Sequence, residues 1–270
     1  MSATVSVVMP SFNSERYIGE AIGSVLCQSH PSYELIVVDG GSKDRTRSIV
    51  QQLALKDSRI KLVENVDDRG PAHARYAGIK MSRGEFIAFL DADDYWIHTK
   101  LEEQVRFMQT HNASFSYTHY RRVSDDGTRV GCVIPMQDQY DFNSALRHRG
   151  IGTLTVMLRR ELLTEDVISR WMRAGGEEYL WWLLILRKGG LARLLPQDLA
   201  RYRDTASSLS KNQIYTLKSV WRMYREDIGL RLVEATSHYA SYFVDSAIRK
   251  LRLKACAAAT TAGASLRGRR

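Results

Sequence analysis

Residues 85–94, which read Glu-Phe-Ile-Ala-Phe-Leu-Asp-Ala-Asp-Asp, lead from an apolar run directly into three carboxylates. The apolar residues 86–90 are typical of a strand buried on both faces, as in a parallel sheet covered by helices. Asp91, Asp93 and Asp94 follow where that strand leaves the core, which is the edge at which open α/β sheets bind ligands. The sequence therefore predicts a functional site at the end of this strand.

The spacing of these acids favours a metal site. Asp91 and Asp93 are two residues apart, so an extended backbone directs both side chains the same way. Two neighbouring carboxylates repel each other without a counter-charge, and a hard divalent cation is the natural one. The alternative is that Asp93 or Asp94 only caps a helix beginning near Trp96, which explains one aspartate but not three.

Three further strand-then-helix units precede this segment. The expected strands cover residues 4–9, 34–38 and 59–63, and the helices after them run over 18–26, from about 44 to 53 and from about 71 to 81. Strands that alternate with helices predict a mostly parallel sheet with right-handed crossovers. The carboxyl ends of such strands meet at one edge, so we expect Asp39, after the second strand, to lie near Asp91.

The chain contains six motifs in a definite order. They read Val-Ser-Val-Val-Met-Pro-Ser-Phe-Asn at 5–13, Glu-Leu-Ile-Val-Val-Asp-Gly-Gly-Ser at 34–42, Gly-Pro-Ala-His-Ala-Arg-Tyr-Ala-Gly at 70–78, Gly followed by the acidic segment at 84–94, Gly-Glu-Glu-Tyr-Leu-Trp-Trp-Leu at 176–183, and Leu-Ala-Arg-Tyr-Arg at 199–203 with Ser-Ser-Leu-Ser at 207–210. Together they resemble the family 2 glycosyltransferases, which are inverting, nucleotide-sugar-dependent enzymes of the GT-A fold.

This resemblance implies a fold class and a domain organisation. Residues 1–211 would form a GT-A glycosyltransferase domain, an α/β fold with a mostly parallel sheet flanked by helices and a Rossmann-like nucleotide-binding half. Residues 212–270 would form a C-terminal helical extension.

The resemblance also implies a donor site at the carboxyl edge of the sheet. Asp93 would bind Mn²⁺ or Mg²⁺, and Asp91 would contact the ribose of a nucleotide-sugar, expected to be a UDP-sugar, or share the metal. Asp39 would accept a hydrogen bond from a base N–H. Arg75 would reach the nucleotide, unless it is a surface arginine, and Arg203 would bind the diphosphate. The donor-binding residues implied are Pro10, Ser11, Phe12, Asn13, Asp39, Arg75, Asp91, Ala92 and Arg203.

Two adjacent glutamates are the candidates for catalysis. Inversion needs a base opposite the leaving group that takes the proton of the attacking acceptor hydroxyl. By resemblance, Glu178 corresponds to the family's catalytic aspartate and Glu177 to the acid before it, and which of the two acts is left open. The alternative is that both only begin a helix, where carboxylates are favoured. Trp181 and Trp182 would form an aromatic platform for an acceptor sugar or pack in the core.

The last fifth of the chain carries most of its positive charge. The whole chain has a formal net charge of +9, and residues 212–270 hold eleven Lys or Arg against four Asp or Glu. This segment has a helical pattern and favours an anionic membrane surface, because rings and cations lie on one helix. The rings singled out are Trp221, Tyr224, Tyr239, Tyr242 and Phe243, among the aromatic residues of this segment, and the cations expected to contribute most are Arg249, Lys250, Arg252 and Lys254. The alternative is a helical pair packed on the preceding domain.

Composition narrows the remaining possibilities. The sequence shows no leader peptide and no apolar run long enough to cross a bilayer. We therefore expect a cytoplasmic protein, peripheral on the inner face of the cell membrane, that uses a lipid-linked saccharide acceptor. No recognisable nucleic-acid-binding fold accompanies the charge, so nucleic acid is not an expected partner. Three cysteines without paired spacing indicate neither a disulfide framework nor a zinc site.

Other classes of protein compete with this interpretation. A sugar nucleotidyltransferase would share the nucleotide-binding sheet and a metal-bound aspartate, but it needs a glycine-rich, basic loop after the first strand. This chain has Pro-Ser-Phe-Asn there, at 10–13, which also lacks the glycine fingerprint of a dinucleotide oxidoreductase. A non-catalytic scaffold at the membrane surface would leave the acids at 91–94 and 177–178 unexplained.

Overall fold

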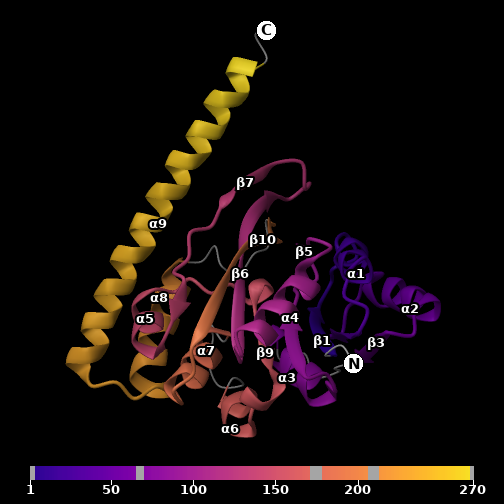
Figure 1. Ribbon diagram of the computed structural model, residues 1–270, viewed down its shortest axis with the longest axis horizontal. Coiled ribbons are helices and arrows are strands. Elements are labelled where there is room, and N and C mark those ends of the chain that lie inside the picture. Colours follow the sequence, from indigo (N-terminus) through magenta and orange to yellow (C-terminus); the bar gives the residue numbers. More distant parts are fainter. Residues whose placement is uncertain (1–3, 65–69, 171–177, 206–212, 268–270) are drawn as a thin grey trace.

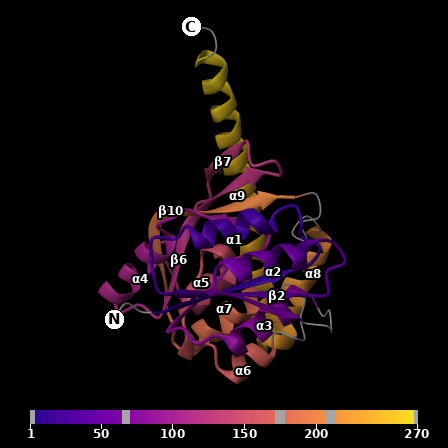
Figure 2. The same ribbon diagram turned by 90° about the vertical axis from the view of Figure 1, so that its right-hand side faces the viewer.

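The computed structural model describes residues 4–64, 70–170, 178–205 and 213–267, and its centre is a mixed sheet with helices on both faces (Figures 1 and 2). The strands are β1 (Val5–Ser11), β2 (Tyr33–Asp39), β3 (Ile60–Glu64), β4 (Phe86–Phe89), β5 (Tyr95–Trp96), β6 (Phe115–Ser124), β7 (Val130–Val133), β8 (Gln139–Tyr140), β9 (Met157–Arg159) and β10 (Ala192–Asp204). The helices are α1 (Ile18–Leu26), α2 (Thr46–Lys56), α3 (Pro71–Met81), α4 (Lys100–Thr110), α5 (Phe142–Arg147), α6 (Glu165–Ile168), α7 (Glu178–Arg187), α8 (Gln213–Arg222) and α9 (Leu232–Arg267), with short 3₁₀ turns η1 (Thr153–Thr155) and η2 (Arg160–Leu162) and a π-helical segment η5 (Met223–Asp227).

The strand order of the sheet places several strand ends at one edge. The order is β3-β2-β1-β4-β9-β6-β10-β5, with β7 paired to β6 and β8 to β10. β3, β2, β1 and β4 pair in parallel, as the alternation of strands and helices predicts. β9 is antiparallel to both β4 and β6, so β6 runs in the same direction as β4. The carboxyl ends of these strands therefore share the upper edge in Figure 1, where β6 leads into β7.

Alternating side chains of the central strands form two cores, one on each face of the sheet. On β1, Val5, Val7 and Met9 pack with α1, α2 and α4, whereas Val8 packs on the opposite face with α3 and α7. All four are fully buried. Burying a large apolar side chain of this kind stabilises a fold by about 1.5–3 kcal/mol. The expected strand at 86–90 is covered on both faces in the same way.

The helix expected near Trp96 begins later than predicted. Tyr95 and Trp96 form the short strand β5, which pairs antiparallel with β10, and α4 starts at Lys100. The indole Nε1 of Trp96 donates to the carbonyl of Leu154 at 2.8 Å. Pairing with a strand from the distant end of the domain thus overrides the local helical pattern. Thr99 precedes α4, so neither Asp93 nor Asp94 is its cap.

Most rings of the C-terminal segment pack on the protein itself. Tyr224 and Tyr242 are buried in the core that contains α7, and Trp221 and Tyr239 pack against it, whereas Phe243 is 58% exposed. The expectation that these rings face a membrane is wrong for all but Phe243, because the core supplies their contacts. No described helix has the length and apolar character needed to span a membrane. The domain boundary predicted at residues 211 and 212 lies outside the described residues.

The cysteines differ from the expectation in one respect. Cys27 is an exposed free thiol, but Cys132, in β7, is disulfide-bonded. The prediction of no disulfide is therefore wrong for Cys132. Sequence spacing could not reveal it, because disulfide formation depends on the distance between cysteines in the folded chain.

Lys100, the first residue of α4, is a buried amine without a carboxylate partner among the described residues. It is fully buried, its Nζ donates to Gln104 Oε1 at 2.7 Å, and it lies 4.1 Å from the ring centre of Trp96. Burial lowers the pKa of Lys100 to about 7. The unfolded chain holds this proton up to a pH near 10, so between about pH 7 and 10 it binds more protons than the folded chain.

We expect Lys100→Met to remove a pH dependence of stability. In the native protein the contribution of Lys100 is fully present above about pH 10 and is lost as the pH falls through 7, because the buried amine must then be charged. Urea unfolding at pH 7 and pH 9.5 should show a rise in the free energy of unfolding that the variant lacks. Lys56→Met, at an exposed lysine, is the control and should keep the rise. Equal pH slopes in all three proteins would contradict this assignment.

Candidate functional site

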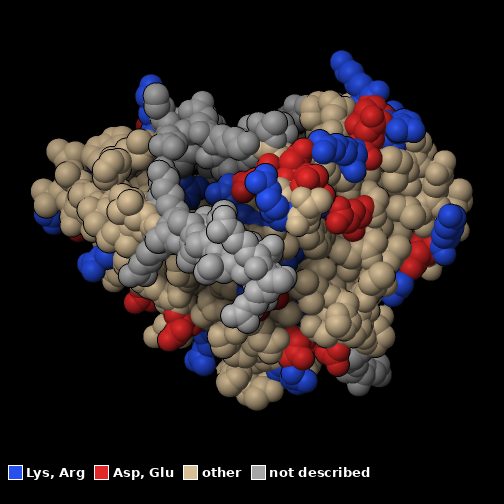
Figure 3. All heavy atoms as spheres, turned by 90° about the horizontal axis from the view of Figure 1, so that it is seen from above, with Lys and Arg blue, Asp and Glu red and all other residues tan. Residues whose placement is uncertain are grey.

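The carboxyl ends of β1, β2 and β4 bring predicted donor residues to one edge of the sheet. β1 and β2 stay in register up to Ser11 and Asp39, and the backbone N–H of Leu90, just after β4, donates to the carbonyl of Val8 at 3.1 Å. Asp39 thus ends β2 and Asp91 lies just after β4, the two strands that flank β1. Figure 3 views this edge from above and shows a hollow in which acidic and basic side chains gather.

Arg75, in the first half of α3, lies at the centre of this site. Its side chain is only 2% exposed, and its two terminal nitrogens form ion pairs with two different acids. Nη2 pairs with Asp91, and Nη1 lies 2.5 Å from Oε1 of Glu178, the first residue of α7. The two carboxylates stay 33% and 32% exposed. One buried cation therefore joins the acid after β4 to the proposed base, and the alternative of a surface arginine is wrong.

Asp93 and Asp94 occupy different environments. Asp94 is buried, and its Oδ1 accepts a hydrogen bond from the backbone N–H of Arg203 at 2.8 Å. The carboxylate of Asp93 receives no hydrogen bond or ion pair from another described residue. Burial, and next the negative charge of Asp91, raise the pKa of Asp93 to about 6. Burial, and next the charges of Asp93 and Asp91, raise the pKa of Asp94 well above its usual range too, so what distinguishes Asp93 is a carboxylate that no other described residue contacts by a hydrogen bond or ion pair.

These acids fit a divalent cation that the donor helps to bind. Within the described part of the chain, no group of three or more His, Cys, Asp or Glu side chains could hold a metal by itself. Mg²⁺ and chemically similar ions are often bound by one or two carboxylates together with substrate phosphates. Asp93, with its uncompensated charge, and the partly exposed Asp91 match that pattern. A cation beside Asp93 would favour its charged form and so oppose the burial, and next the repulsion from Asp91, that raise its pKa.

Arg203, near the end of β10, supports the turn that carries Asp93. Its guanidinium is 3% exposed and donates through all three nitrogens to protein acceptors. Nε donates to the carbonyl of Asp93 at 2.9 Å, Nη1 to the carbonyl of Asp125 at 3.0 Å, and Nη2 to Oε2 of Glu20 at 2.5 Å. The predicted contact with a diphosphate stays a prediction. Arg201, two residues earlier, pairs instead with Asp198.

The supporting acceptors of Arg203 were not found from the sequence. Glu20 lies in α1, and Asp125 follows β6, far from Arg203 along the chain. The only local signal is the turn-forming Asp-Gly pair at 126–127, which marks the loop but not its partner.

The loops after β1 and β2 are tied to each other. Asp39 is 1% exposed and accepts hydrogen bonds from the backbone N–H groups of Gly41 at 3.1 Å and Ser42 at 2.9 Å. Asn13 adopts a left-handed conformation, with φ of 46°, and its Oδ1 accepts from the backbone N–H of Lys43 at 2.9 Å. Pro10, Ser11 and Ala92 are buried, whereas Phe12 is 49% exposed. A contact of these residues with a nucleotide base stays a prediction.

Trp181 and Trp182 do not form a platform for an acceptor sugar. Both side chains are fully buried. Each ring centre lies 6.0 Å from that of Phe89, the last residue of β4. They therefore pack beneath the strand that carries the acids and hold α7 against it. Glu177, and the segment at 207–210, lie outside the described residues.

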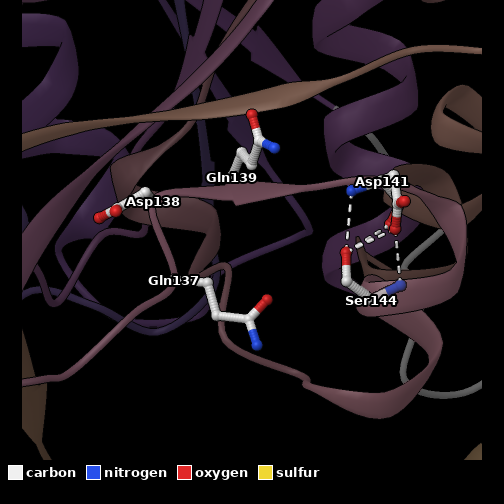
Figure 4. Close-up of a pocket in the computed structure, with 5 residues that line it drawn as sticks. All are labelled: Gln137, Asp138, Gln139, Asp141 and Ser144. Carbon is white, nitrogen blue, oxygen red and sulfur yellow. Dashed lines mark hydrogen bonds between the residues drawn. The ribbon is translucent and has the colours of Figure 1, made fainter.

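The structure has another surface pocket, two of whose lining residues cap a helix. Gln137, Asp138, Gln139, Asp141 and Ser144 line it, around β8 and the start of α5 (Figure 4). Asp141 accepts from the backbone N–H of Ser144 at 2.7 Å, and Ser144 Oγ accepts from that of Asp141 at 2.9 Å. This capping box stabilises the first turn of α5. The lining shares no residue with the carboxyl edge, which remains the better candidate site.

We expect Arg203→Lys to destabilise the protein, because one ammonium cannot reach three acceptors on separate segments. The loss of two carbonyl contacts should lower the free energy of unfolding by about 2 kcal/mol in urea denaturation. Arg45→Lys is a matched control, since the side chain of Arg45 is 82% exposed and pairs with Glu15 at the surface. That substitution should cost less than about 0.5 kcal/mol. Equal effects of both substitutions would contradict a structural role for Arg203.

Comparisons with known proteins agree with this arrangement. Residues 6–165 match the model of the family described as "Glycosyl transferase family 2". TuaG of Bacillus subtilis (strain 168), named for teichuronic acid biosynthesis, is 37% identical over 92% of this chain and 97% of its own. WfgD of Escherichia coli, named as a UDP-Glc:alpha-D-GlcNAc-diphosphoundecaprenol beta-1,3-glucosyltransferase, is 39% identical over 80% of this chain and 83% of its own.

Solved structures share the fold. S. aureus TarS in complex with UDP-GlcNAc superposes with a TM-score of 0.70 at 20% identity, over 89% of this chain and 71% of that one. The mannosyltransferase PcManGT of Pyrobaculum calidifontis, in complex with GDP-Man and Mn²⁺, gives a TM-score of 0.66 at 20% identity, over 98% and 76% of the two chains. These matches confirm the expected GT-A fold. With the family model and the two relatives, they establish that the chain belongs to family 2 of the glycosyltransferases.

Proposed function

We propose that this protein is an inverting, metal-dependent hexosyltransferase that moves a sugar from a UDP-sugar to a lipid-linked saccharide in surface polysaccharide assembly. The observation that carries the proposal is the bridge from Arg75 to Asp91 and Glu178. The bridge holds Asp91, an acid suited to binding the donor, and Glu178, an acid suited to activating the acceptor, around one guanidinium. The name of WfgD makes UDP-glucose the first donor to test, and GlcNAc on a lipid diphosphate the first acceptor.

Asp93 and Asp91 would hold a Mn²⁺ or Mg²⁺ ion together with the donor's phosphates. When bound, such an ion neutralises the charge that develops on the departing nucleoside diphosphate. Arg203 keeps the backbone of Asp93 in place from behind, through its hydrogen bond to the carbonyl. The Mn²⁺ in the PcManGT complex supports this choice of cation.

Glu178 would act as the general base. Oε1 of Glu178 is bound by Arg75, so Oε2 is the atom that accepts the proton of the attacking acceptor hydroxyl. The hydroxyl oxygen forms a bond to the anomeric carbon, the bond from that carbon to the phosphate oxygen breaks, and the diphosphate leaves with the electron pair. Attack from the face opposite the leaving group inverts the anomeric centre. Arg75 fixes the carboxylate in position, which supplies part of the rate enhancement through orientation.

We further propose that the protein works at the inner face of the cell membrane. The lipid diphosphate acceptor in the name of WfgD and the basic C-terminal segment of this chain support that location.

A donor and acceptor screen tests the proposed activity. The full chain is incubated with Mn²⁺, a panel of UDP-sugars and dTDP-sugars, and a GlcNAc-diphospholipid analogue, and release of nucleoside diphosphate is measured. The proposal requires release that depends on both donor and acceptor. Release of pyrophosphate from a nucleoside triphosphate and a sugar phosphate would instead indicate a nucleotidyltransferase, and no turnover with any donor would favour a scaffold.

We expect Asp93→Asn to reduce transfer by about a thousandfold or more while the fold is kept. The change removes the charge that the cation needs, and with it several kcal/mol of leaving-group stabilisation. Initial rates over a Mn²⁺ titration provide the measurement. Asp57→Asn, at a surface aspartate that pairs with Arg59, is the control and should leave the titration unchanged. Full metal-stimulated activity in Asp93→Asn would show that another residue binds the ion.

We expect Glu178→Gln to lose turnover and keep donor affinity. The amide is nearly isosteric but cannot accept the proton, and a general base contributes about a hundredfold to ten-thousandfold in rate. Steady-state kinetics and calorimetric titration with the donor separate the two effects. Glu177→Gln is the matched variant. An active Glu178→Gln beside an inactive Glu177→Gln would assign the base to Glu177.

A further inference from the structure

One side of helix α9 is apolar and exposed. Between residues 240 and 251, every described side chain that is exposed is apolar. Its four large members are Phe243, Val244, Ile248 and Leu251, which are 58%, 57%, 45% and 67% exposed. We call the following set the α9 stripe: Ala240, Phe243, Val244, Ala247, Ile248 and Leu251. Steps of three and four residues place these side chains on one face of a helix.

The opposite side of α9 is attached to the protein, which fixes the direction of the α9 stripe. Tyr242 is buried in the core. Asp245 Oδ1 lies 2.9 Å from Nδ1 of His148, and Nη1 of Arg249 donates to the carbonyl of Arg149 at 2.6 Å. Figure 1 shows α9 along the side of the molecule and projecting past the edge of the sheet where the strands end. These contacts prevent the helix from turning the α9 stripe inward.

Charge distinguishes the possible occupants of the α9 stripe. Besides Arg249, which is bound to the body, the sequence after Ile248 continues with the cations Lys250, Arg252 and Lys254. A second copy paired in parallel would place these cations against themselves. An antiparallel pair would place them against residues 238–243, which contain no acid. An anionic lipid surface, in contrast, complements both the apolar stripe and the cations that follow it.

We propose that the α9 stripe is the surface through which this protein binds an anionic bilayer, with α9 lying in the plane of the interface. This inference rests on the proposed function, because a lipid-linked acceptor lies in a membrane. Of the five rings that the sequence suggested for membrane contact, four pack on the core. The apolar contact is therefore assigned to the α9 stripe, which includes only the fifth ring, Phe243.

Vesicle co-sedimentation of the full chain tests the proposal. The wild-type protein should bind vesicles that contain phosphatidylglycerol and should bind pure phosphatidylcholine vesicles much less. Val244→Glu combined with Ile248→Glu should weaken binding by about tenfold or more, because it places charge on the apolar contact. Gln51→Glu combined with Gln52→Glu, at exposed polar positions of α2, outside α9, adds the same two charges as a matched control and should retain most of the binding.

A second variant tests the contribution of charge. Replacing Lys250, Arg252 and Lys254 by Gln should reduce binding to the anionic vesicles by about a hundredfold, and 0.5 M salt should reduce wild-type binding in the same direction. Arg249 is left unchanged because it holds α9 to the body.

Two outcomes would overturn the proposal. One is wild-type binding that is absent or is unaffected by the stripe variant. The other is a wild-type dimer in light scattering that the stripe variant converts to a monomer, which would make a second copy the occupant. Transfer to a water-soluble acceptor analogue should be equal in wild type and all variants, so a failure of lipid binding remains distinguishable from a failure of the proposed activity.

Discussion

The site depends on one buried guanidinium held between two acids. Arg75 comes from α3, Asp91 from the loop after β4 and Glu178 from the start of α7, so their ion pairs fix three elements relative to one another. A buried arginine is costly unless its charge is matched, and Arg75 has a carboxylate at each of its terminal nitrogens. The same contacts leave the side chains of both acids about one third exposed to solvent. One interaction therefore defines the geometry of the site.

The surrounding fold supports this interaction from two sides. Behind it, Trp181 and Trp182 pack on Phe89 and hold α7 against β4, so that Glu178 is brought toward Asp91. On the donor side, Arg203 ties the backbone of Asp93 to the loop at Asp125. The carboxylate of Asp93 is left without a hydrogen bond or ion pair to another described residue, and burial, and next the charge of Asp91, raise its pKa. Asp91 is paired with Arg75 and Asp94 accepts from the backbone of Arg203, so among the described residues Asp93 is the aspartate of this cluster that is left to bind a cation.

Local sequence patterns predicted the strands and helices whose formation depends on residues close together in the chain. Apolar runs with strand and helix periods gave β1 to β4 and the helices between them, and parallel pairing then placed Asp39 and Asp91 on either side of β1. The resemblance to the family identified Arg75 and Glu178, but not that they pair. What could not be predicted are contacts between residues distant in the chain. Trp96 joins a strand because β10 lies beside it, and Tyr224 and Tyr242 are buried because α7 supplies a core.

We propose above all that the site at the carboxyl edge transfers a sugar with inversion, using Glu178 opposite the leaving group. The stereochemistry of the product tests it most directly. With an α-linked donor such as UDP-glucose and an acceptor that supports turnover, proton NMR of the product should show a newly formed β-glycosidic linkage. An α-linked product would contradict this mechanism, because a single displacement with Glu178 as the base must invert the anomeric centre.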